Sequence, residues 1–295
     1  MYVHKILPLI VFVFISAFTS FSSIANNHQD HTVISTAFDY QTNETMNINL
    51  TPVSENTFTF SYLGVDGEQV NGQISYPATK NEKYPVMIGI HAMGRSFVRW
   101  WDASHNGKPT VTHVNKLTEF ADEKGYVVIA IDARNHGSRK IKGKELGVVM
   151  TQLKQGKPAL YEAMIKDTVI DHRLLLDWIA AQKNFDQNNI RVAGYSMGAQ
   201  VSLLLASVDD RIKNVLAIVP PYVEQNLPHI SPVNMVPLLT KTPVLLVTSN
   251  KDQYSTEDQN QQLFNAIPSE NKVRMVFNSD HLLPPNYVNS LAFWF

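Results

Sequence analysis

Short runs of apolar residues, each bounded by polar or turn-forming residues, recur along the chain. They lie at residues 86–90, 126–131, 190–193, 215–219, 244–247 and 273–277. Continuous apolar runs of this length are typical of strands that are buried on both faces of a sheet. Segments with helical periodicity lie between or after them, at residues 114–124, 161–182, 197–207, 257–266 and beyond Pro285. Strands that alternate with helices predict right-handed crossovers and a mostly parallel sheet.

An earlier segment has a period of two residues. Phe58, Phe60 and Tyr62 alternate with polar or small neighbours, Asp66-Gly67 is a turn signal, and the alternation resumes at Val70. Such a pattern predicts a β-hairpin. We therefore expect an α/β fold with a mostly parallel central sheet, an N-terminal antiparallel hairpin and helices on both faces.

The start of the chain has the pattern of a secretory signal peptide. Lys5 precedes an apolar run at residues 6–18, and Ser23-Ile24-Ala25 provides the small residues that a signal peptidase requires. An uncleaved membrane anchor is the alternative, but the run contains Pro8 and is shorter than the roughly 20 residues that a span needs. We expect a signal peptide at 1–25, a polar lead-in segment at 26–55, a folded domain at 56–295, and a secreted or periplasmic protein without a stable membrane anchor.

Composition and charge exclude several classes of chemistry. Lys and Arg total 25 and Asp and Glu total 26, so no basic surplus favours nucleic acid as a partner. The chain contains no cysteine, which rules out disulfides, thiolate metal ligands and a cysteine nucleophile. Its ten histidines show no metal-binding spacing, so we expect neither a metal nor another cofactor.

One serine stands between two glycines, in the stretch Gly194-Tyr195-Ser196-Met197-Gly198. The stretch follows a predicted strand and opens a predicted helix. A sharp strand-to-helix turn strains its central residue and exposes that side chain at the carboxyl edge of the sheet, where ligands bind in α/β folds. We therefore expect Ser196 to be a nucleophile and the N–H of Met197 to face the oxyanion that its attack creates.

A serine nucleophile needs a base and a group that orients the base. Asp252 follows the predicted strand at 244–247, and His281 follows the one at 273–277. The order serine, aspartate, histidine is that of the nucleophile-elbow hydrolases. We expect His281 to take the proton from Ser196 and Asp252 to fix the tautomer of the imidazole. The rival acid is Asp280, and the rival bases are His91, His136 and His229.

A series of motifs resembles the α/β-hydrolase superfamily, in the branch of dienelactone hydrolases, acetyl xylan esterases and related secreted esterases. The motifs are IGIHAMG (88–94), IDARNHGS (131–138), GYSMG (194–198), DDRIKNVLAIVP (209–220), Asp252 and His281. The resemblance covers residues 70–285 and implies a second oxyanion donor, the N–H of Met93. Ala92 replaces a family glycine, which leaves the choice between Met93 and Ala92 open. Asn135 and Ser249 also replace family glycines.

These residues predict a serine hydrolase that cleaves carboxylic esters through an acyl-enzyme intermediate. The substrate would be a small-molecule or polymer-borne ester. Two alternatives remain open: a single-domain peptidase or amidase of the same fold, and a non-catalytic relative that keeps the fold.

Other features have structural interpretations beside functional ones. His172 lies on an apolar helical stripe and is expected in the core. The aromatic side chains of Phe97, Trp100 and Trp101 either line the cleft or pack beneath the loop. The proline-rich segment 220–243 is expected to form a rim or short cap. A solvated basic loop is expected at Arg139, Lys140, Lys142 and Lys144.

Overall fold

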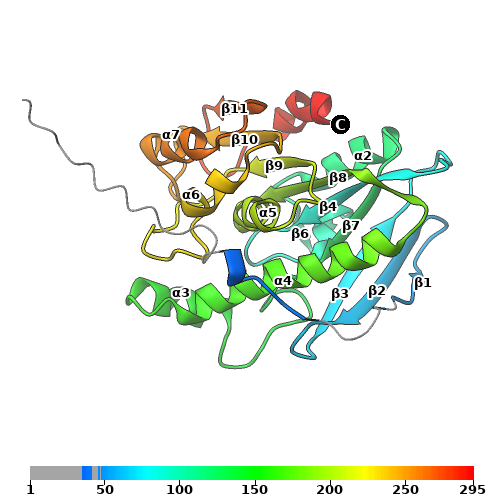
Figure 1. Cartoon of the computed structure of the whole chain (residues 1–295), viewed down its shortest axis with the longest axis horizontal. Coiled ribbons are helices and arrows are strands. Elements are labelled where there is room, and N and C mark those ends of the chain that lie inside the picture. Colours follow the sequence, from blue (N-terminus) through cyan, green and yellow to red (C-terminus); the bar gives the residue numbers. More distant parts are fainter. Residues whose placement is uncertain (1–34, 42–45, 47) are drawn as a thin grey trace, which may run out of the picture.

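The computed structural model describes residues 35–41, 46 and 48–295, and its main feature is a nine-stranded sheet (Figure 1). The sheet order is β1-β2-β3-β7-β4-β8-β9-β10-β11. The strands are β1 (Thr51–Pro52), β2 (Thr57–Leu63), β3 (Gln69–Ser75), β4 (Tyr84–Ile90), β7 (Val127–Ile131), β8 (Phe185–Tyr195), β9 (Asn214–Ile218), β10 (Val244–Ser249) and β11 (Lys272–Phe277). A separate ribbon pairs β5 (Ser104–His105) with β6 (Lys108–Pro109). The predicted signal peptide and part of the predicted lead-in lie outside the described residues.

Strand directions agree with the α/β class predicted from the sequence. β7, β4, β8, β9, β10 and β11 pair in parallel. β1, β2 and β3 are antiparallel to their neighbours, and the β2–β3 hairpin turns at Asp66-Gly67 as predicted. The fold is therefore a mostly parallel sheet with an N-terminal antiparallel hairpin.

Strand β11 departs from the expectation of burial on both faces. Val273 is 50% exposed and Val276 is 51% exposed. Among the described strands β11 has only β10 as a neighbour, because it forms one edge of the sheet. Side chains at such an edge are covered by fewer packed elements than those of the central strands.

Helices cover both faces of the sheet (Figure 1). One layer contains α4 (Ala159–Ala181), α5 (Met197–Val208) and α7 (Glu257–Ala266). The other contains α2 (Val114–Glu123) and the 3-10 helix η3 (Pro285–Trp294). Consecutive strand residues face alternate layers, so Ile88 of β4 joins the first core and Met87 joins the second.

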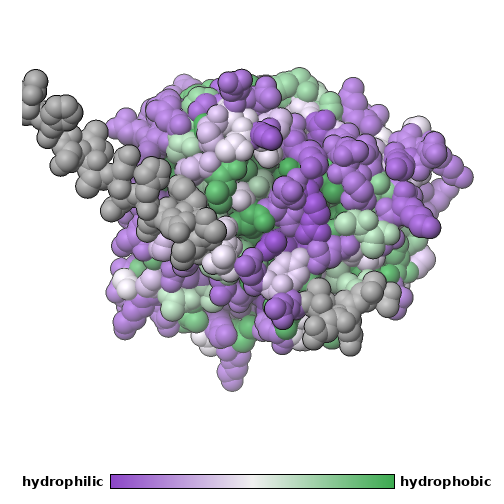
Figure 2. All heavy atoms as spheres, in the orientation of Figure 1, coloured by the Kyte–Doolittle hydropathy of each residue, from purple (hydrophilic) through white to green (hydrophobic). Residues whose placement is uncertain are grey.

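Short helices that the sequence pattern did not predict complete the described part. They are α3 (Leu146–Lys154), α6 (Pro232–Met235) and the 3-10 helices η1 (Phe97–Trp100) and η2 (Val236–Leu238). No helix in residues 35–41, 46 and 48–295 is long and apolar enough to cross a membrane. Polar residues cover most of the face that α4 occupies, and hydrophobic ones gather near its middle, close to α5 (Figure 2).

The two tryptophans after β4 are held by packing against strands. Trp100 is fully buried, and a Cβ atom added to Gly89 would lie 2.4 Å from its ring. The indole N–H of Trp101 donates a hydrogen bond to Ser75 Oγ at 2.9 Å. For Trp100 the packing interpretation is therefore correct, and Gly89 is required because a side chain there would displace the indole.

The basic segment after β7 is only partly solvated, which corrects the expectation of a solvated loop. Lys140, Lys142 and Lys144 are exposed, but the Arg139 side chain is 2% exposed. Its Nη1 donates to Asp171 Oδ2 at 2.7 Å. A buried arginine needs a carboxylate partner, and α4 supplies it.

Three histidines are buried near the middle of the molecule. His172 lies in the core as predicted, and its Nδ1 contacts the Thr168 carbonyl oxygen at 2.7 Å. The rings of His91 and His136 lie 5.1 Å apart. Burial lowers the pKa of His91 and His172 to about 4 and that of His136 to about 3. The three side chains are therefore neutral at pH 7 in the folded protein.

We expect the protein to lose stability as the pH falls from 7 to 5. In the unfolded chain these histidines have their ordinary pKa of 6.5, so the unfolded state binds more protons below that pH. At pH 5 each histidine then costs about 2 kcal/mol of unfolding free energy. Urea unfolding curves at pH 7 and pH 5 measure the loss.

A His172→Asn variant is the control for this acid effect. The amide can still donate to the Thr168 carbonyl, but it does not titrate. The variant should lose less stability between pH 7 and pH 5 than the wild type. An equal loss in both proteins would show that His172 does not contribute to the acid sensitivity.

Candidate active site

The predicted site residues follow strands whose carboxyl ends meet at one edge of the sheet. β4 and β8 are neighbours in the sheet although β7 lies between them in the chain. The chain thus leaves β4 toward one side and returns to the other, and ligands bind at such a switch point. Met93 lies in the loop after β4, and Ser196 follows β8 directly.

Ser196 occupies a strained turn between β8 and α5. Its backbone angles are φ 57° and ψ −119°, a region that non-glycine residues rarely adopt. A Cβ atom on Gly194 would lie 2.1 Å from Gly198 O, and one on Gly198 would lie 2.1 Å from Ile90 O. Both flanking positions therefore require glycine, which explains the spacing of the motif.

The side chains of Ser196, His281 and Asp252 form one hydrogen-bonded chain. His281 Nε2 lies 2.8 Å from Ser196 Oγ, and His281 Nδ1 lies 2.8 Å from Asp252 Oδ2. A carboxylate can only accept, so Nδ1 carries the proton and Nε2 is free to accept from the serine hydroxyl. The structure thus brings together the three residues that the chain order singled out.

The acid and base of this chain are shielded from water. The Asp252 side chain is 1% exposed and that of His281 is 10% exposed. The second carboxylate oxygen of Asp252 accepts from the N–H of Tyr254 at 2.8 Å, and the Tyr254 ring contacts the His281 ring edge-on at 4.6 Å. Low solvent access strengthens the electrostatic coupling between Asp252 and His281.

The rival residues lie in other arrangements. Asp280 is exposed and accepts from the N–H of Leu282 at 2.9 Å. His91 accepts from the N–H of Ala133 at 3.1 Å, so it holds the loop after β4 against the end of β7. The contact partner of His136 Nδ1 is the Arg134 carbonyl oxygen at 2.7 Å. No hydrogen bond links any of these residues to Ser196 among the described contacts.

Two hydroxyl groups to which the sequence analysis assigned no role, those of Tyr195 and Ser249, bond to the loops of the site. Tyr195 Oη donates to the His281 carbonyl at 2.8 Å and accepts from the N–H of Leu283 at 3.1 Å. Ser249 Oγ donates to the Ser279 carbonyl, which ties the loop of Asp252 to the loop of His281. The serine that replaces a family glycine thus has a positioning role.

Replacing Tyr195 with phenylalanine should lower kcat by about 5- to 10-fold with little change in KM. Loss of its two hydrogen bonds frees the His281 loop, at roughly 1 kcal/mol for each bond. Steady-state kinetics on p-nitrophenyl acetate measure the split. Tyr287→Phe is the matched control, because this buried hydroxyl donates to the Thr112 carbonyl away from His281. Equal losses of kcat in both variants would contradict a positioning role for Tyr195.

The two predicted oxyanion donors follow neighbouring strands of the sheet, Met93 after β4 and Met197 after β8. Met197 is the first residue of α5, where backbone N–H groups and the helix dipole favour negative charge. Met93 lies in a turn that the N–H of Arg95 closes onto the Ala92 carbonyl at 3.1 Å. No group of three histidine, aspartate or glutamate side chains within the described part of the chain is arranged to hold a metal ion.

Solved structures with the same fold include several esterases. The acetyl xylan esterase 1 of Thermoanaerobacterium sp. JW/SL YS485 is 19% identical, with a TM-score of 0.69 over 90% of this chain and 92% of that chain. The acetyl xylan esterase of Paenibacillus sp. R4 is 18% identical, with a TM-score of 0.67 over 90% of each chain. A cold-adapted esterase from an Arctic intertidal metagenomic library is 18% identical, with a TM-score of 0.61 over 85% of this chain and 99% of that chain.

Sequence comparison identifies the family. No curated protein matches the chain. A family model does match, that of acetyl xylan esterase (AXE1), over residues 31–226. The match spans about two thirds of the chain and contains Ser196, while Asp252 and His281 follow it. The chain therefore belongs to the acetyl xylan esterase family and is a carboxylic ester hydrolase of the α/β-hydrolase fold.

Proposed function

We propose that the chain cleaves its ester through a covalent acyl intermediate on Ser196, with Asp252 and His281 as the other members of a catalytic triad. The observation that carries the proposal is the continuous hydrogen-bond chain from Asp252 through His281 to Ser196, with 2.8 Å at each contact. A serine hydroxyl is a weak nucleophile, and this arrangement supplies the base and the group that orients it.

In the first half of the reaction Ser196 Oγ attacks the ester carbonyl carbon while His281 Nε2 takes the hydroxyl proton. The carbonyl oxygen becomes an oxyanion, which the N–H groups of Met197 and Met93 stabilise. The imidazolium then donates the proton to the alcohol oxygen as the C–O bond breaks. The alcohol leaves, and the acyl group stays on Ser196.

In the second half a water molecule repeats the sequence. His281 Nε2 takes a proton from the water, and the resulting hydroxide attacks the acyl carbon. The second tetrahedral intermediate collapses, Ser196 Oγ recovers its proton from His281, and the carboxylic acid leaves. Asp252 stays ionised throughout and stabilises the imidazolium in both halves.

We further propose acetyl esters of sugars as the substrate class. The family that matches the chain is named acetyl xylan esterase, and two of the solved structures with this fold carry the same name. An acetylated polysaccharide fragment lies outside the cell, which agrees with the proposed secreted or periplasmic location. That location depends on the predicted signal peptide at residues 1–25.

Trapping of the intermediate tests the proposal. We expect brief incubation with p-nitrophenyl acetate, followed by acid quenching and peptide mass spectrometry, to show one acetyl group on the peptide that contains Ser196. A panel of p-nitrophenyl esters should show the highest kcat/KM for acetate. Acetylation elsewhere, or faster cleavage of amides than of esters, would contradict the proposal and favour the peptidase alternative.

A further inference from the structure

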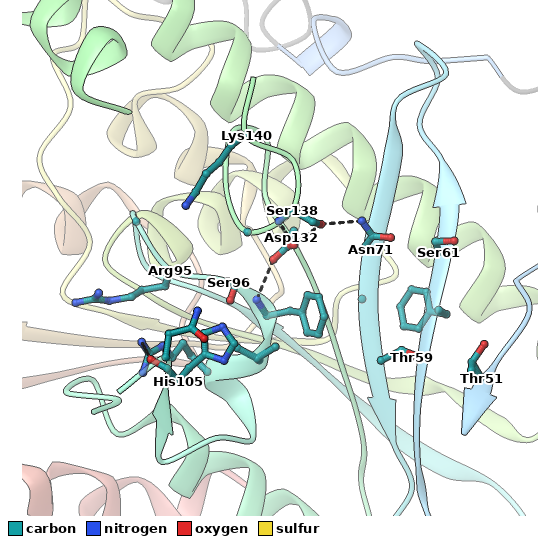
Figure 3. Close-up of a pocket in the computed structure, with 18 of the residues that line it drawn as sticks. Thr51, Thr59, Ser61, Asn71, Arg95, Ser96, His105, Asp132, Ser138 and Lys140 are labelled. Atoms are coloured by element: carbon teal, nitrogen blue, oxygen red, sulfur yellow. Dashed lines mark hydrogen bonds between the residues drawn. The ribbon is translucent and has the colours of Figure 1, made fainter. Parts of the chain in front are cut away.

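A hollow of about 810 Å³ lies between the antiparallel strands β1–β3 and the loop after β4 (Figure 3). Arg95, Lys140 and His105 lie on one side of it (Figure 3). Thr59, Ser61 and Asn71 of β2 and β3 lie on the other (Figure 3). Its lining is thus made of cationic and hydrogen-bonding side chains.

Most of the positive charge of the hollow is not paired with acids; only His105 has an acidic neighbour, with its Nδ1 3.7 Å from Asp102 Oδ2. Arg95, Lys108 and Lys140 form no ion pair with any described carboxylate. The guanidinium of Arg99 is buried and donates to neutral oxygens, the carbonyls of Lys108 and His105. These unpaired cations favour an anionic ligand.

The one acid in the lining is already engaged. Asp132 accepts from the N–H of Phe97 at 3.1 Å, and from the N–H and hydroxyl of Ser138 at 3.0 Å each. Burial raises the pKa of this carboxyl, and all of these donors fix it in place. Asp132 therefore builds the wall of the hollow and leaves the cationic side chains to face a ligand.

The opposite wall presents a row of neutral hydrogen-bonding groups. Thr59 and Ser61 share one face of β2, because alternate residues of a strand point the same way. Thr51 of β1 is paired with Thr59, and Asn71 of β3 is paired with Ser61, so the row crosses three strands. Hydroxyl and amide groups in such a row match the hydroxyl groups of a sugar.

The loop after β4 connects the hollow to the proposed active site along the chain. Gly94 and Arg95 line it, and Met93, the proposed oxyanion donor, directly precedes them. Adjacent Cα atoms are about 3.8 Å apart. This link along the chain is the reason to consider one oligosaccharide as the ligand of both places.

We propose that the hollow binds a uronic acid unit, a sugar that carries a carboxylate, of an acetylated oligosaccharide. The cationic side supplies the partners of the carboxylate, and the hydroxyl groups of Thr51, Thr59 and Ser61 supply those of the sugar hydroxyl groups; the amide of Asn71 already contacts Ser138 and Gln69. The inference rests on the proposed function for the link to ester cleavage. Binding itself can be measured without catalysis.

Calorimetric titration of the Ser196→Ala protein tests the inference with three probes. They are xylotriose that carries a glucuronic acid branch, unbranched neutral xylotriose, and inorganic phosphate. The acidic oligosaccharide should bind about 10-fold more tightly than the neutral one at low salt, and the difference should shrink as the salt concentration rises. Phosphate alone should bind more weakly than the acidic oligosaccharide, because it cannot use the hydroxyl row.

Substitutions locate the binding. Arg95→Gln and Lys140→Gln should each weaken binding of the acidic oligosaccharide by about 3- to 10-fold. Lys142→Gln is the matched control, because this lysine is exposed on the same segment and does not line the hollow. Equal binding of both oligosaccharides, phosphate binding as tight as the acidic sugar, or an equal effect of Lys142→Gln would overturn the inference.

Hydrolysis of p-nitrophenyl acetate by the protein with Ser196 intact separates this inference from the proposed function. This small ester has neither a carboxylate nor a sugar, so Lys140→Gln should leave its cleavage within about 2-fold of the wild type. Normal cleavage without selective oligosaccharide binding would refute the uronic acid site alone. Selective binding without any ester cleavage would refute the catalytic proposal alone.

Discussion

Replacing Ser196 with alanine is expected to lower kcat on p-nitrophenyl acetate by about 10⁴- to 10⁶-fold. The reason is that no other hydroxyl is hydrogen-bonded to His281 Nε2 among the described residues, and Ser196 Oγ contacts it at 2.8 Å. KM reports the uniform binding of substrate and should change far less. Stopped-flow traces of the variant should show no burst of p-nitrophenol, because no acyl intermediate can form on Ser196.

Substitutions of the proposed triad residues should have non-additive effects on activity. His281→Ala should lose about as much activity as Ser196→Ala, and the double variant should lose no more than either. Asp252→Asn should cost about 10³- to 10⁴-fold, because the imidazole survives in the wrong tautomer. Steady-state kinetics on the four proteins, with circular dichroism as a check on folding, measure this pattern.

Asp280→Asn is the matched control for the acid. It removes a carboxylate directly beside His281, but this side chain is exposed and bonded to the N–H of Leu282. We expect its kcat within about 3-fold of the wild type. A large loss of kcat in Asp280→Asn with normal kcat in Asp252→Asn would show that Asp280 is the acid of the triad and would refute the assignment to Asp252.

The central strands could be predicted because burial on both faces of the sheet requires a continuous run of apolar residues. β4 and β7 are covered by helices on both faces, so the apolar runs of these strands are continuous. The same pattern predicted the strand β11 but not the solvent exposure of its side chains. That exposure follows from the place of β11 at the edge of the sheet, which depends on strand pairing and cannot be read from local sequence. β8 also begins earlier than the apolar run predicts, since Phe185 already pairs with Tyr84.

The candidate site could be predicted as far as chain order and strand ends determine it. Ser196, Asp252 and His281 each follow a strand of one parallel sheet, and the carboxyl ends of such strands meet. The supporting roles of Tyr195 and Ser249 could not be predicted in this way. Their hydroxyl groups bond to carbonyls 86 and 30 residues away in the chain, and no local pattern encodes such distant partners.

The error at Arg139 has the same origin. A run of basic residues between elements is usually solvated, and its neighbours Lys140 and Lys142 are indeed exposed. Arg139 differs because Asp171 lies 32 residues later on α4 and turns a carboxylate toward it. The resulting cluster contains a second buried arginine, Arg134, whose Nε lies 2.8 Å from Asp171 Oδ2.

Replacing Asp171 with alanine should destabilise the protein by about 3–5 kcal/mol. Its side chain is fully buried, with Oδ1 2.9 Å from Arg134 Nη2 and Oδ2 2.7 Å from Arg139 Nη1. Removing the carboxylate leaves two buried guanidinium groups without their shared partner, although Arg134 keeps its ion pairs with the partly exposed acids Asp66 and Glu68. Urea unfolding followed by circular dichroism measures the change.

Asp167→Ala is the control, because this acid is on the same helix one turn earlier and is partly exposed. Its ion pair is a 4.0 Å contact with Lys166, and its charge acts on Arg134 without a hydrogen bond. We expect it to cost at most about 1 kcal/mol. Equal losses of unfolding free energy in the two variants would show that the ion pairs of Asp171 with the buried arginines do not account for its contribution to stability.

Asp171→Ala should also lower the activity of the enzyme at temperatures where the variant is still folded. Arg134 and Arg139 belong to the segment after β7, and the N–H of Ala133 in that segment donates to His91. His91 in turn anchors the loop that carries Met93. Loosening the cluster should therefore lower kcat more than it raises KM, because an oxyanion donor acts mainly in the transition state. A variant with reduced stability but unchanged kcat would show that the loop after β4 holds its position without this support.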